Sequence, residues 1–482
     1  MSLYEPTWNS LRRHHTPEWF RDAKFGIYTH WGVYSVPACG PNVTWYPYFM
    51  YREGNYQYDH HVKTYGGPEK FGYKDFIPKF TGERFDPDEW AELFRKAGAR
   101  FAGPVGEHHD GFCLWDTQYG EWKSTRMGPK RDVVGELERA IRQQQMKFLV
   151  ALHHAENWWF FPHWRKEFDT SDPRCAGLYG EPHNLDGFPD TDESSGQDLP
   201  SRAFLDLWLN KTREVIDKYQ PDVLWFDGGL RIIEERGKLD MLAHYYNKAA
   251  EWGREVVVNY KGNGLPPNIA VLDHELGREG ALTCHEWLTD TTVDDGQGWA
   301  YLADATYKSA ASLVHYLVDN VSKNGYLLLN VGPKPDGCIP EEAQALLLDI
   351  GRWLEINGEA IYGTTPWHTY GEGPTVPVEA GVFQEGQNTQ YTAQDIRFTV
   401  KDDALYATCL AWPRDSVTIM SLKGFYLYPH EGLSVTLLGS DHPLTWRRTD
   451  KGLVINTPAK PPCEHAYVFK IVRQSAITRR QE

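Results

Sequence analysis

Several features that define whole classes of protein are missing from this chain of 482 residues. It has no run of about 18 apolar residues, so we expect no transmembrane helix and no insertion into a membrane. The first residues, MSLYEPTWNSLRRHH, contain no apolar stretch, so the sequence predicts no signal peptide and indicates no cellular compartment. No CxxC spacing occurs, which indicates neither a zinc ribbon nor a disulfide framework for the seven cysteines, Cys39, Cys113, Cys175, Cys284, Cys338, Cys409 and Cys463.

Positive charge is also scarce. Lys and Arg number 50 against 66 Asp and Glu, which gives a formal net charge of −16. Because no local basic patch offsets this surplus of acid, we expect neither nucleic acid nor an anionic membrane surface as a partner. Hydrophobic residues make up 41% of the chain, enough to bury a large core, and this excludes disorder as the main state.

Aromatic and imidazole side chains are abundant: 19 Trp, 27 Tyr and 19 His. Indole and phenol groups need partners for their polar atoms, so a core gains less from them than from aliphatic residues. Trp together with His indicates flat apolar platforms edged by hydrogen-bonding groups. Sugar rings suit such surfaces, because their C–H faces stack on aromatic rings while their hydroxyls take directional bonds. A Trp-rich core is the alternative.

The first 360 residues alternate between short apolar runs and amphipathic helical patterns. The apolar runs predict seven strands, at Phe25–Thr29, Phe101–Val105, Phe148–Leu152, Val223–Phe226, Val256–Asn259, Ile269–Leu272 and Tyr326–Val331. The periodic segments predict helices at Pro87–Ala99, Val133–Gln145, Ala203–Tyr219, Leu239–Trp252, Ala310–Val321 and Glu341–Ile356. This alternation predicts a parallel sheet, either doubly wound or closed into a (β/α)₈ barrel.

Two observations favour the barrel. No GxGxxG follows the first strand, which weakens the dinucleotide-binding alternative. Polar residues come just after several separate strands, and a barrel gathers the carboxyl ends of its strands at one face; these residues are His30, His108, His153, Asp227, Lys261 and Glu275. After Trp367 the pattern changes to short alternating runs broken by Gly, Pro and Asp, typical of antiparallel strands. We therefore expect a barrel over residues 1–367 and a small antiparallel β-domain over 368–482.

Asp227 follows an apolar strand in the segment DVLWFDGG. A strand places its last side chain on a rigid element facing the barrel mouth, as a nucleophilic carboxylate requires. A helix-capping aspartate is the structural alternative. Two histidine pairs, in EHHDGF (107–112) and LHHAEN (152–157), also follow strands and could bind sugar hydroxyls. Together with Asp110 and Asp227 they could instead build a metal site, although no HExxH spacing is present.

Two glutamates are candidates for a second catalytic carboxyl group. Glu275 closes a strand-like run and is expected at the barrel mouth, whereas Glu286 is expected on a loop beside Trp287. Glycoside hydrolysis needs one carboxyl group as nucleophile or base and another, of raised pKa, as acid. Burial against an aromatic ring raises a carboxyl pKa. For each glutamate, a helix cap or a surface charge is the alternative.

The segments WFRDAKFGIYTHWGVYSVPA, TWYPYFM, FDPDEWAELFRKAGA, EHHDGFCLWDT, DVLWFDGG and LLLNVGPKPDGCIPEEAQALLLDIGRWLEINGEAIYGTTPW occur in this order over residues 18–367. Together they resemble the α-L-fucosidases of glycoside hydrolase family 29. The resemblance implies a (β/α)₈-like barrel followed by a C-terminal β-sandwich. It also implies a retaining exo-hydrolase that removes terminal α-L-fucose from oligosaccharides or glycoconjugates by double displacement, without metal or cofactor, in an enzyme that is often multimeric.

The resemblance also implies roles for individual residues. Asp227 matches the nucleophile, and the residues that match contacts to fucose are His30, Trp45, His108, His109 and Trp225. Lys261 stands where the family often has arginine, and Thr44 replaces a family glutamate next to Trp45. A single ammonium does not reproduce a guanidinium fork, so the contact made by Lys261 differs. His153 stands where the family often supplies a tyrosine.

The acid/base follows two patterns within the family. Glu275 matches the enzymes of broad specificity, and Glu286 matches the branch that acts on α-1,3/1,4-branched oligosaccharides. We favour Glu275 because it leaves a strand rather than a loop. The alternatives are a retaining glycosidase for a related sugar such as galactose, a carbohydrate-binding protein of this fold without catalysis, and a metal-dependent hydrolase.

Overall fold

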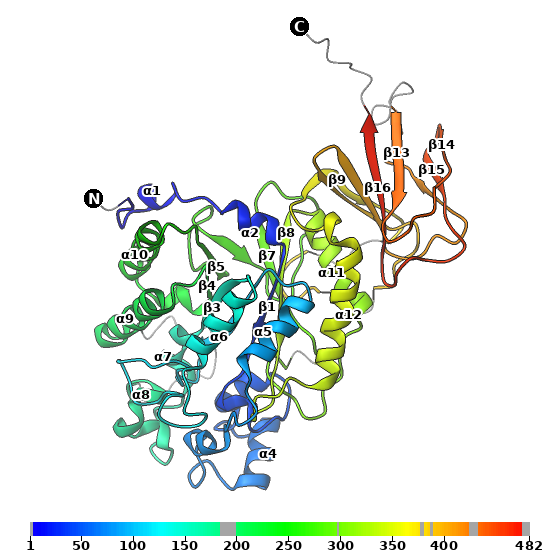
Figure 1. The fold of residues 1–482 in the computed structure, drawn as a ribbon. Helices are drawn as coiled ribbons and strands as arrows, with labels where there is room; N and C mark the ends of the chain where they lie inside the picture. Colours follow the sequence, from blue (N-terminus) through cyan, green and yellow to red (C-terminus); the bar gives the residue numbers. More distant parts are fainter. Residues whose placement is uncertain are drawn as a thin grey trace.

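Eight parallel strands form a closed barrel at the centre of the N-terminal part of the molecule (Figure 1). The computed structural model describes residues 3–183, 199–295, 298–375, 380–385, 389–423 and 432–474. Each strand pairs with the next along the chain, and β8 closes the barrel against β1. The strands are β1 (Phe25–Thr29), β2 (Phe101–Glu107), β3 (Lys147–Leu152), β4 (Val223–Phe226), β5 (Val257–Lys261), β6 (Val271–Asp273), β7 (Trp287–Thr292) and β8 (Gly325–Val331).

Helices cover the outside of this barrel (Figure 1). The long ones are α5 (Pro87–Lys96), α6 (Val133–Gln143), α9 (Arg202–Tyr219), α10 (Glu235–Trp252), α11 (Ala310–Ser322) and α12 (Glu341–Asn357). Helix α4 (Tyr56–Tyr65) is as long as α5, and the short ones are α1 (Trp8–Leu11), α2 (Glu18–Ala23), α3 (Tyr46–Phe49), α7 (Asn157–Phe160) and α8 (Ala176–Tyr179). The predicted barrel is confirmed. The fully described connections 262–270 and 274–286, on either side of β6, contain no helix.

Local chemistry explains where α5 begins and which way it faces. The carboxylate of Asp86 accepts hydrogen bonds from the backbone N–H groups of Asp88 and Glu89, and Pro87 occupies the first turn. Trp90 and Phe94, four residues apart, are buried against the barrel. The other long helices repeat this amphipathic pattern.

Strand β7 is the one barrel strand that the apolar runs did not predict; Glu286 lies on the connection before it, as expected. Its sequence, WLTDTT, is mostly polar, yet all six residues are buried. Hydrogen bonds satisfy most of the polar groups: Thr289 donates from Oγ1 to the carbonyl of His274 at 2.7 Å, and Oδ2 of Asp290 accepts from the hydroxyl of Tyr28 at 2.8 Å. Buried polar groups with such partners are tolerated in a core.

The C-terminal strands form two antiparallel sheets, which confirms the predicted architecture (Figure 1). One sheet has the order β13 (Gly432–Leu437), β16 (Tyr467–Gln474), β11 (Ala404–Cys409), β10 (Ile396–Lys401), β9 (Thr365–Glu372). The other has the order β12 (Ser416–Ile419), β15 (Gly452–Asn456), β14 (Trp446–Thr449). Phe398, Ile419 and Ile455 share one core, so the sheets pack face to face. Strand β9 spans the predicted division at residue 367, and the division itself stays a prediction.

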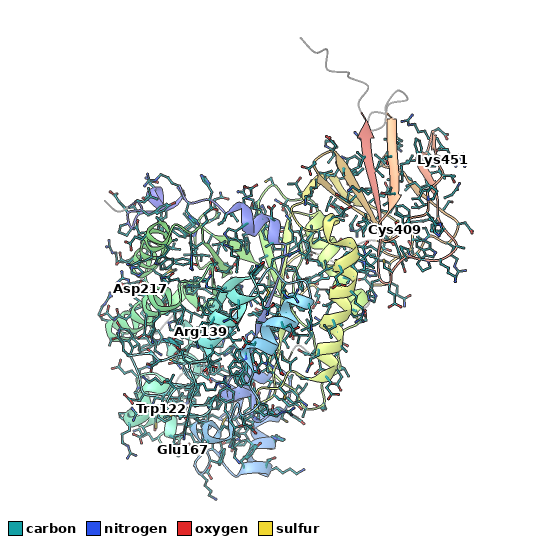
Figure 2. All side chains as sticks on the ribbon, viewed as in Figure 1. Trp122, Arg139, Glu167, Asp217, Cys409 and Lys451 are labelled. Carbon is teal, nitrogen blue, oxygen red and sulfur yellow. The ribbon has the colours of Figure 1, made fainter. Side chains whose placement is uncertain are left out.

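All seven cysteines are free thiols. Cys409, labelled in Figure 2, lies in β11 and is fully buried in the core between the two C-terminal sheets.

In the part of the chain that the structure describes, no helix has both the length and the apolar character needed to cross a membrane.

Candidate active site

The carboxyl ends of the barrel strands bring together most of the residues that the sequence singled out. They line one pocket, and Trp45 closes it from the short helical turn Val43–Trp45 after β1. The predicted residues found in this pocket are His30, Trp45, His108, His109, His153, Asp227, Lys261 and Glu275. Parallel strands in a barrel end at one face, which explains why residues more than 200 positions apart meet here.

Two predicted residues lie elsewhere. Trp225 is fully buried beneath the pocket, where its indole donates to Asp273 at 2.7 Å and its ring lies 4.8 Å from Nζ of Lys261. It therefore supports the pocket floor rather than lining the pocket. Glu286 comes just before β7, at the amino end of that strand and thus at the opposite end of the barrel, and it pairs with Arg21 at 2.6 Å. The structure therefore does not bring Glu286 into this pocket.

Asp227 stands at the end of β4 in a cationic setting. Its Oδ2 lies 3.3 Å from Nε2 of His109 and 3.4 Å from Nδ1 of His153. Burial alone would raise the pKa of Asp227, but the ammonium of Lys261 and the two histidines outweigh burial and hold that pKa well below its usual range. Asp227 is therefore an ionised carboxylate at neutral pH.

Gly229 lets the chain turn sharply after this carboxylate. A Cβ atom at Gly229 would lie 2.6 Å from Cγ of Glu156 and 2.9 Å from Cβ of Ala155, closer than packed atoms approach. The glycine thus allows the segment after β4 to lie against the segment after β3.

Lys261, at the end of β5, connects three carboxylates. Its Nζ lies 2.9 Å from Glu275, 3.1 Å from Asp290 and 3.3 Å from Asp227. Burial opposes its charge, but the carboxylates, Asp290 first, raise the pKa of Lys261 well above its usual value. A permanent ammonium therefore sits between Asp227 and Glu275.

Glu275 differs from Asp227 in its ionisation. Burial raises the pKa of Glu275 to about 7, and the negative charges of Asp290 and Asp227 act in the same direction against Lys261. The pocket thus holds one carboxylate that is ionised and one carboxyl group that keeps its proton up to neutral pH. Such a pair can act as nucleophile and general acid.

His109 is the one histidine of the group held in its protonated form. Burial disfavours its charge, but Glu156, 3.4 Å away, and Asp227 raise the pKa of His109 to about 9. Its Nδ1 lies 2.9 Å from the carbonyl of His153 and donates to it, which fixes the ring so that Nε2 faces both carboxylates. His109 therefore contributes a second positive charge beside Asp227.

The other three histidines are neutral. Burial lowers the pKa of His30 and of His108 well below the usual value, and it also lowers the pKa of His153. Nδ1 of His30 donates to the side-chain oxygen of Asn330 at 2.8 Å, so its Nε2 is an acceptor. Neutral rings can both donate to and accept from sugar hydroxyls. Nitrogens of His30, His108 and His153 also lie within 4.8 Å of one another, so this set could hold a metal ion.

Several residues of the site were not found from the sequence. Asp290 lies in β7, whose sequence gave a weak signal, and Asp273 is the last residue of β6, one position beyond the predicted run. Tyr28 and Trp299 complete the lining of the pocket. Burial, together with the nearby charge of Asp290, raises the pKa of Asp273 well above its usual value. The sequence offered one indication of Asp290, because this aspartate stands in the middle of LTDTT, a segment as long as a strand.

A wider cleft of about 510 Å³ adjoins this pocket and shares Trp45 with it. Its walls are aromatic and basic: Tyr48, Phe49, Arg52, Trp164 and Arg165 contribute to them. The Trp45 ring lies 5.5 Å from that of His109 on one side and 5.1 Å from that of Tyr48 on the other. Trp45 is thus the boundary between a deep polar pocket and a broader aromatic cleft.

The barrel carries an ionised and a protonated carboxyl group at the carboxyl ends of its strands, among imidazole and indole rings. This fold and this pair of groups define the class of glycoside hydrolases. Residues 1–359 match the α-L-fucosidase family model, and residues 387–472 match the model of the α-L-fucosidase C-terminal domain. The chain belongs to the α-L-fucosidase family.

Relatives resemble the whole chain. The tissue α-L-fucosidase of Rattus norvegicus is 31% identical over 484 residues, which cover 98% of this chain and 93% of the relative. The structure of the Thermotoga maritima α-fucosidase in complex with a mechanism-based inhibitor is 33% identical, covers 97% of this chain and 100% of its own, and has a TM-score of 0.78. The structure of that enzyme in complex with fucose is 32% identical, also covers 97% of this chain and 100% of its own, and has a TM-score of 0.76.

Proposed function

We propose that this protein is a retaining exo-α-L-fucosidase that releases terminal fucose through a covalent intermediate on Asp227, with Glu275 as acid and base. The observation that carries the proposal is the opposite ionisation of these two groups around one ammonium, that of Lys261. Because Lys261 lies within 3.3 Å of both, the two contacting oxygens are at most about 6 Å apart. Retaining enzymes use separations of about 5–5.5 Å, whereas inverting enzymes use about 6.5–9.5 Å.

In the first step, a carboxylate oxygen of Asp227 attacks the anomeric carbon of fucose. The bond from that carbon to the leaving oxygen breaks, and the proton of Glu275 passes to this oxygen. A bond between the anomeric carbon and Asp227 forms with inverted configuration. His109 and Lys261 lie beside the nucleophile and keep it ionised until substrate binds.

In the second step, Glu275 acts as a base. Esterification removes the negative charge of Asp227, which is one of the charges that raise the pKa of Glu275. The pKa of Glu275 therefore falls in the intermediate, while Lys261 stays in place to stabilise its carboxylate. Glu275 takes a proton from water, the water oxygen attacks the anomeric carbon, and the bond to Asp227 breaks. Two inversions give net retention.

The remaining side chains would recognise the sugar. His30, His108 and His153 present neutral ring nitrogens to the pocket and suit hydroxyl groups that both donate and accept. The sugar that carries the fucose would then occupy the aromatic cleft beyond Trp45, where its ring can stack on Trp164 or Phe49. Assembly of several copies, which the family resemblance implies, stays a prediction that light scattering can check.

The experiment is hydrolysis of an aryl α-L-fucoside followed by NMR, with Asp227→Gly as the matched variant. The native enzyme should release α-L-fucose first, and Asp227→Gly should lose several orders of magnitude in kcat while it keeps its fold. Azide should restore turnover to Asp227→Gly and give a β-fucosyl azide, since the anion attacks from the vacated face. First release of β-L-fucose, or a variant that keeps more than about a tenth of native kcat, would contradict the proposal.

Two controls separate the alternatives. An aryl galactoside tests the related sugar, and prolonged treatment with a chelator tests metal dependence at the histidine cluster. Activity on the fucoside that survives chelation, with little activity on the galactoside, supports the proposal. Absence of activity on both substrates would favour a binding protein.

A further inference from the structure

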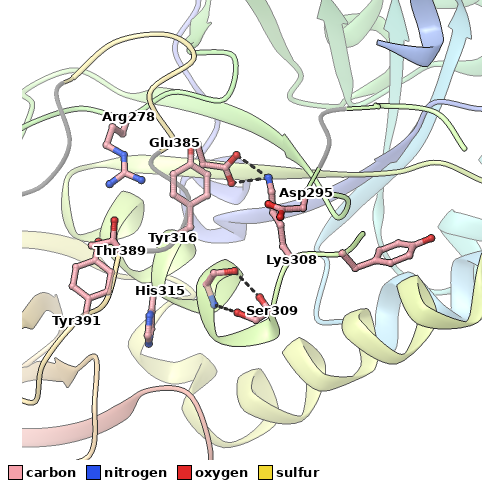
Figure 3. A pocket seen from close by; sticks show the side chains of 11 residues that line it. Arg278, Asp295, Lys308, Ser309, His315, Tyr316, Glu385, Thr389 and Tyr391 are labelled. Carbon is pink, nitrogen blue, oxygen red and sulfur yellow. Dashed lines mark hydrogen bonds and ion pairs between the residues drawn. The ribbon is translucent and has the colours of Figure 1, made fainter. Parts of the chain in front are cut away.

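A second cavity, of about 250 Å³, lies outside the barrel against the start of α11 (Figure 3). Its walls come from the β6–β7 connection, from the β7–α11 connection, from α11 and from two segments, 380–385 and 389–391, between β9 and β10. Among the residues that the structure describes, none lines both this cavity and the pocket of Asp227. The cavity is therefore separate from the proposed active site.

Arg278 stands out in this cavity because, in the part of the chain that the structure describes, its buried charge has no carboxylate partner. Its side chain is only 3% exposed, and within the described ranges its Nε and Nη1 make no hydrogen bond and no carboxylate lies within 4.0 Å. Its guanidinium lies 5.5 Å from the ring of Tyr316 and interacts with the hydroxyl group of Tyr391, which is neutral and leaves the charge uncompensated. A buried, unpaired guanidinium is costly, and native structures normally give it an anion.

The acidic groups of the cavity are placed away from Arg278. Glu385 is bound to Lys308, with 2.7 Å between Nζ and Oε2, and accepts from Thr291 at 2.9 Å. In Figure 3 this ion pair and Asp295 lie at one end of the cavity, while Arg278 lies at the other. Glu385 therefore neutralises Lys308 and not Arg278.

The end of the cavity near Arg278 carries groups that suit an oxyanion. Thr389, Tyr391 and His315 lie on the same side in Figure 3 and supply hydroxyl groups and an aromatic wall. The Tyr391 and His315 rings meet edge to face at 5.3 Å. We propose that this cavity binds a small carboxylate or phosphate ligand through two parallel hydrogen bonds from Arg278.

Such a ligand would also affect the loop that holds Glu275. Arg278 lies three residues after Glu275, and its backbone pairs with that of Gly381 at 3.1 and 2.9 Å. The N–H of Phe383 donates to the carbonyl of Glu275 at 2.7 Å. Filling the cavity would hold both segments together, so the ligand should stabilise the position of Glu275. The effect on Glu275 rests on the proposed function, whereas the binding of an anion to the cavity does not.

The test is the melting temperature of the full chain as inorganic phosphate or acetate is added, with sodium chloride keeping the ionic strength constant. Binding to the folded state should raise the melting temperature in a saturable way. Saturating L-fucose is present in a parallel series, because an anion could also enter the pocket beside Lys261. The rise should persist in fucose. The response to phosphate compared with acetate tells which oxyanion the cavity prefers.

Arg278→Met is the decisive variant, and Arg12→Met, which removes an exposed charge, is its control. Loss of charged hydrogen bonds should weaken anion binding roughly 10- to 100-fold in Arg278→Met, while Arg12→Met should respond like the native chain. Without anion, Arg278→Met should melt no lower than the native chain, because the variant removes a buried unpaired charge.

Three results would overturn the proposal: no saturable rise, a rise that disappears in fucose, or an equal rise in Arg278→Met. If Arg278→Met fails to fold, Tyr391→Phe takes its place, because it removes one hydroxyl group at the same end of the cavity. Weaker anion binding in Tyr391→Phe supports the proposal, and unchanged binding contradicts it.

Discussion

Lys261 places its ammonium 2.9 Å from Oε2 of Glu275, so the proposed acid of this site is held by a cation that opposes its protonation. Family members often have arginine at this position. In this chain a single ammonium charge, rather than a guanidinium with two parallel donors, therefore influences both carboxyl groups on which the reaction depends, those of Asp227 and Glu275.

Replacing Lys261 by methionine should therefore move both limbs of the pH profile. Without the ammonium, the pKa of Asp227 and the pKa of Glu275 should both rise, because a nearby cation lowers a carboxyl pKa. The acid and basic limbs of kcat/KM should move to higher pH, with a loss of roughly 100-fold at the optimum. Lys261→Arg should keep the limbs near their native positions, and the exposed control Lys70→Met should change nothing. A profile of Lys261→Met with unmoved limbs would contradict this account.

Glu275→Ala should show a dependence on the leaving group that Glu286→Ala lacks. A general acid matters most for a poor leaving group, so Glu275→Ala should lose far more activity on an oligosaccharide than on a dinitrophenyl fucoside. Azide should attack the intermediate from the face that Glu275 serves and give an α-fucosyl azide, the opposite anomer from that of Asp227→Gly. Glu286 pairs with Arg21 at the other end of the barrel, so its replacement should give a small loss that is independent of the leaving group. An azide product from Glu286→Ala would reverse the assignment.

The two glutamates show what could be predicted from the sequence. Asp227 and Glu275 follow apolar strands of ordinary composition, and the rule that barrel strands end at one face places them correctly. Glu286 was expected on a loop and lies on one, but the strand after it, WLTDTT, has too few apolar residues to be recognised. The sequence therefore did not reveal that this loop precedes a strand and lies at the opposite end of the barrel from Glu275. Asp290 was missed for the same reason. Its burial depends on partners, Tyr28 and Lys261, that are distant in sequence.

Trp164 should affect the sugar that leaves rather than fucose itself. It lines the cleft that shares Trp45 with the catalytic pocket. Trp164→Ala should raise KM for a fucosylated oligosaccharide roughly tenfold, the value of one aromatic stacking contact, and leave the kinetics on an aryl fucoside nearly unchanged. Tyr119→Ala, an exposed aromatic control outside the cleft, should alter neither substrate. Equal effects of Trp164→Ala on both substrates would place the cleft outside the path of the leaving sugar.

Asp319 should be the residue that ties the C-terminal sheets to the barrel. This buried carboxylate of α11 lies 2.7 Å from Nζ of Lys323 and 2.5 Å from Nε of Arg397 in β10. Asp319→Asn would leave two buried cations without their counterion, so it should lower the free energy of unfolding by about 3–5 kcal/mol. Asp349→Asn, on the partly exposed α12 carboxylate that pairs with Arg352, should cost less than about 1 kcal/mol.

The contribution of Asp319 should also depend on pH with a definite sign. Burial opposes its ionisation, but Lys323 and Arg397 outweigh burial and lower the pKa of Asp319 to about 2. A carboxyl group whose pKa is lower in the folded state stabilises that state above the pKa of the unfolded chain, about 3.9, and loses this effect as the pH falls through the folded value. Urea unfolding followed by tryptophan fluorescence should therefore show a large gap between the native chain and Asp319→Asn at pH 7. The gap should narrow as the pH is lowered from 5 toward 2. A gap of constant size over this range would mean that the stabilisation does not come from the charge of Asp319.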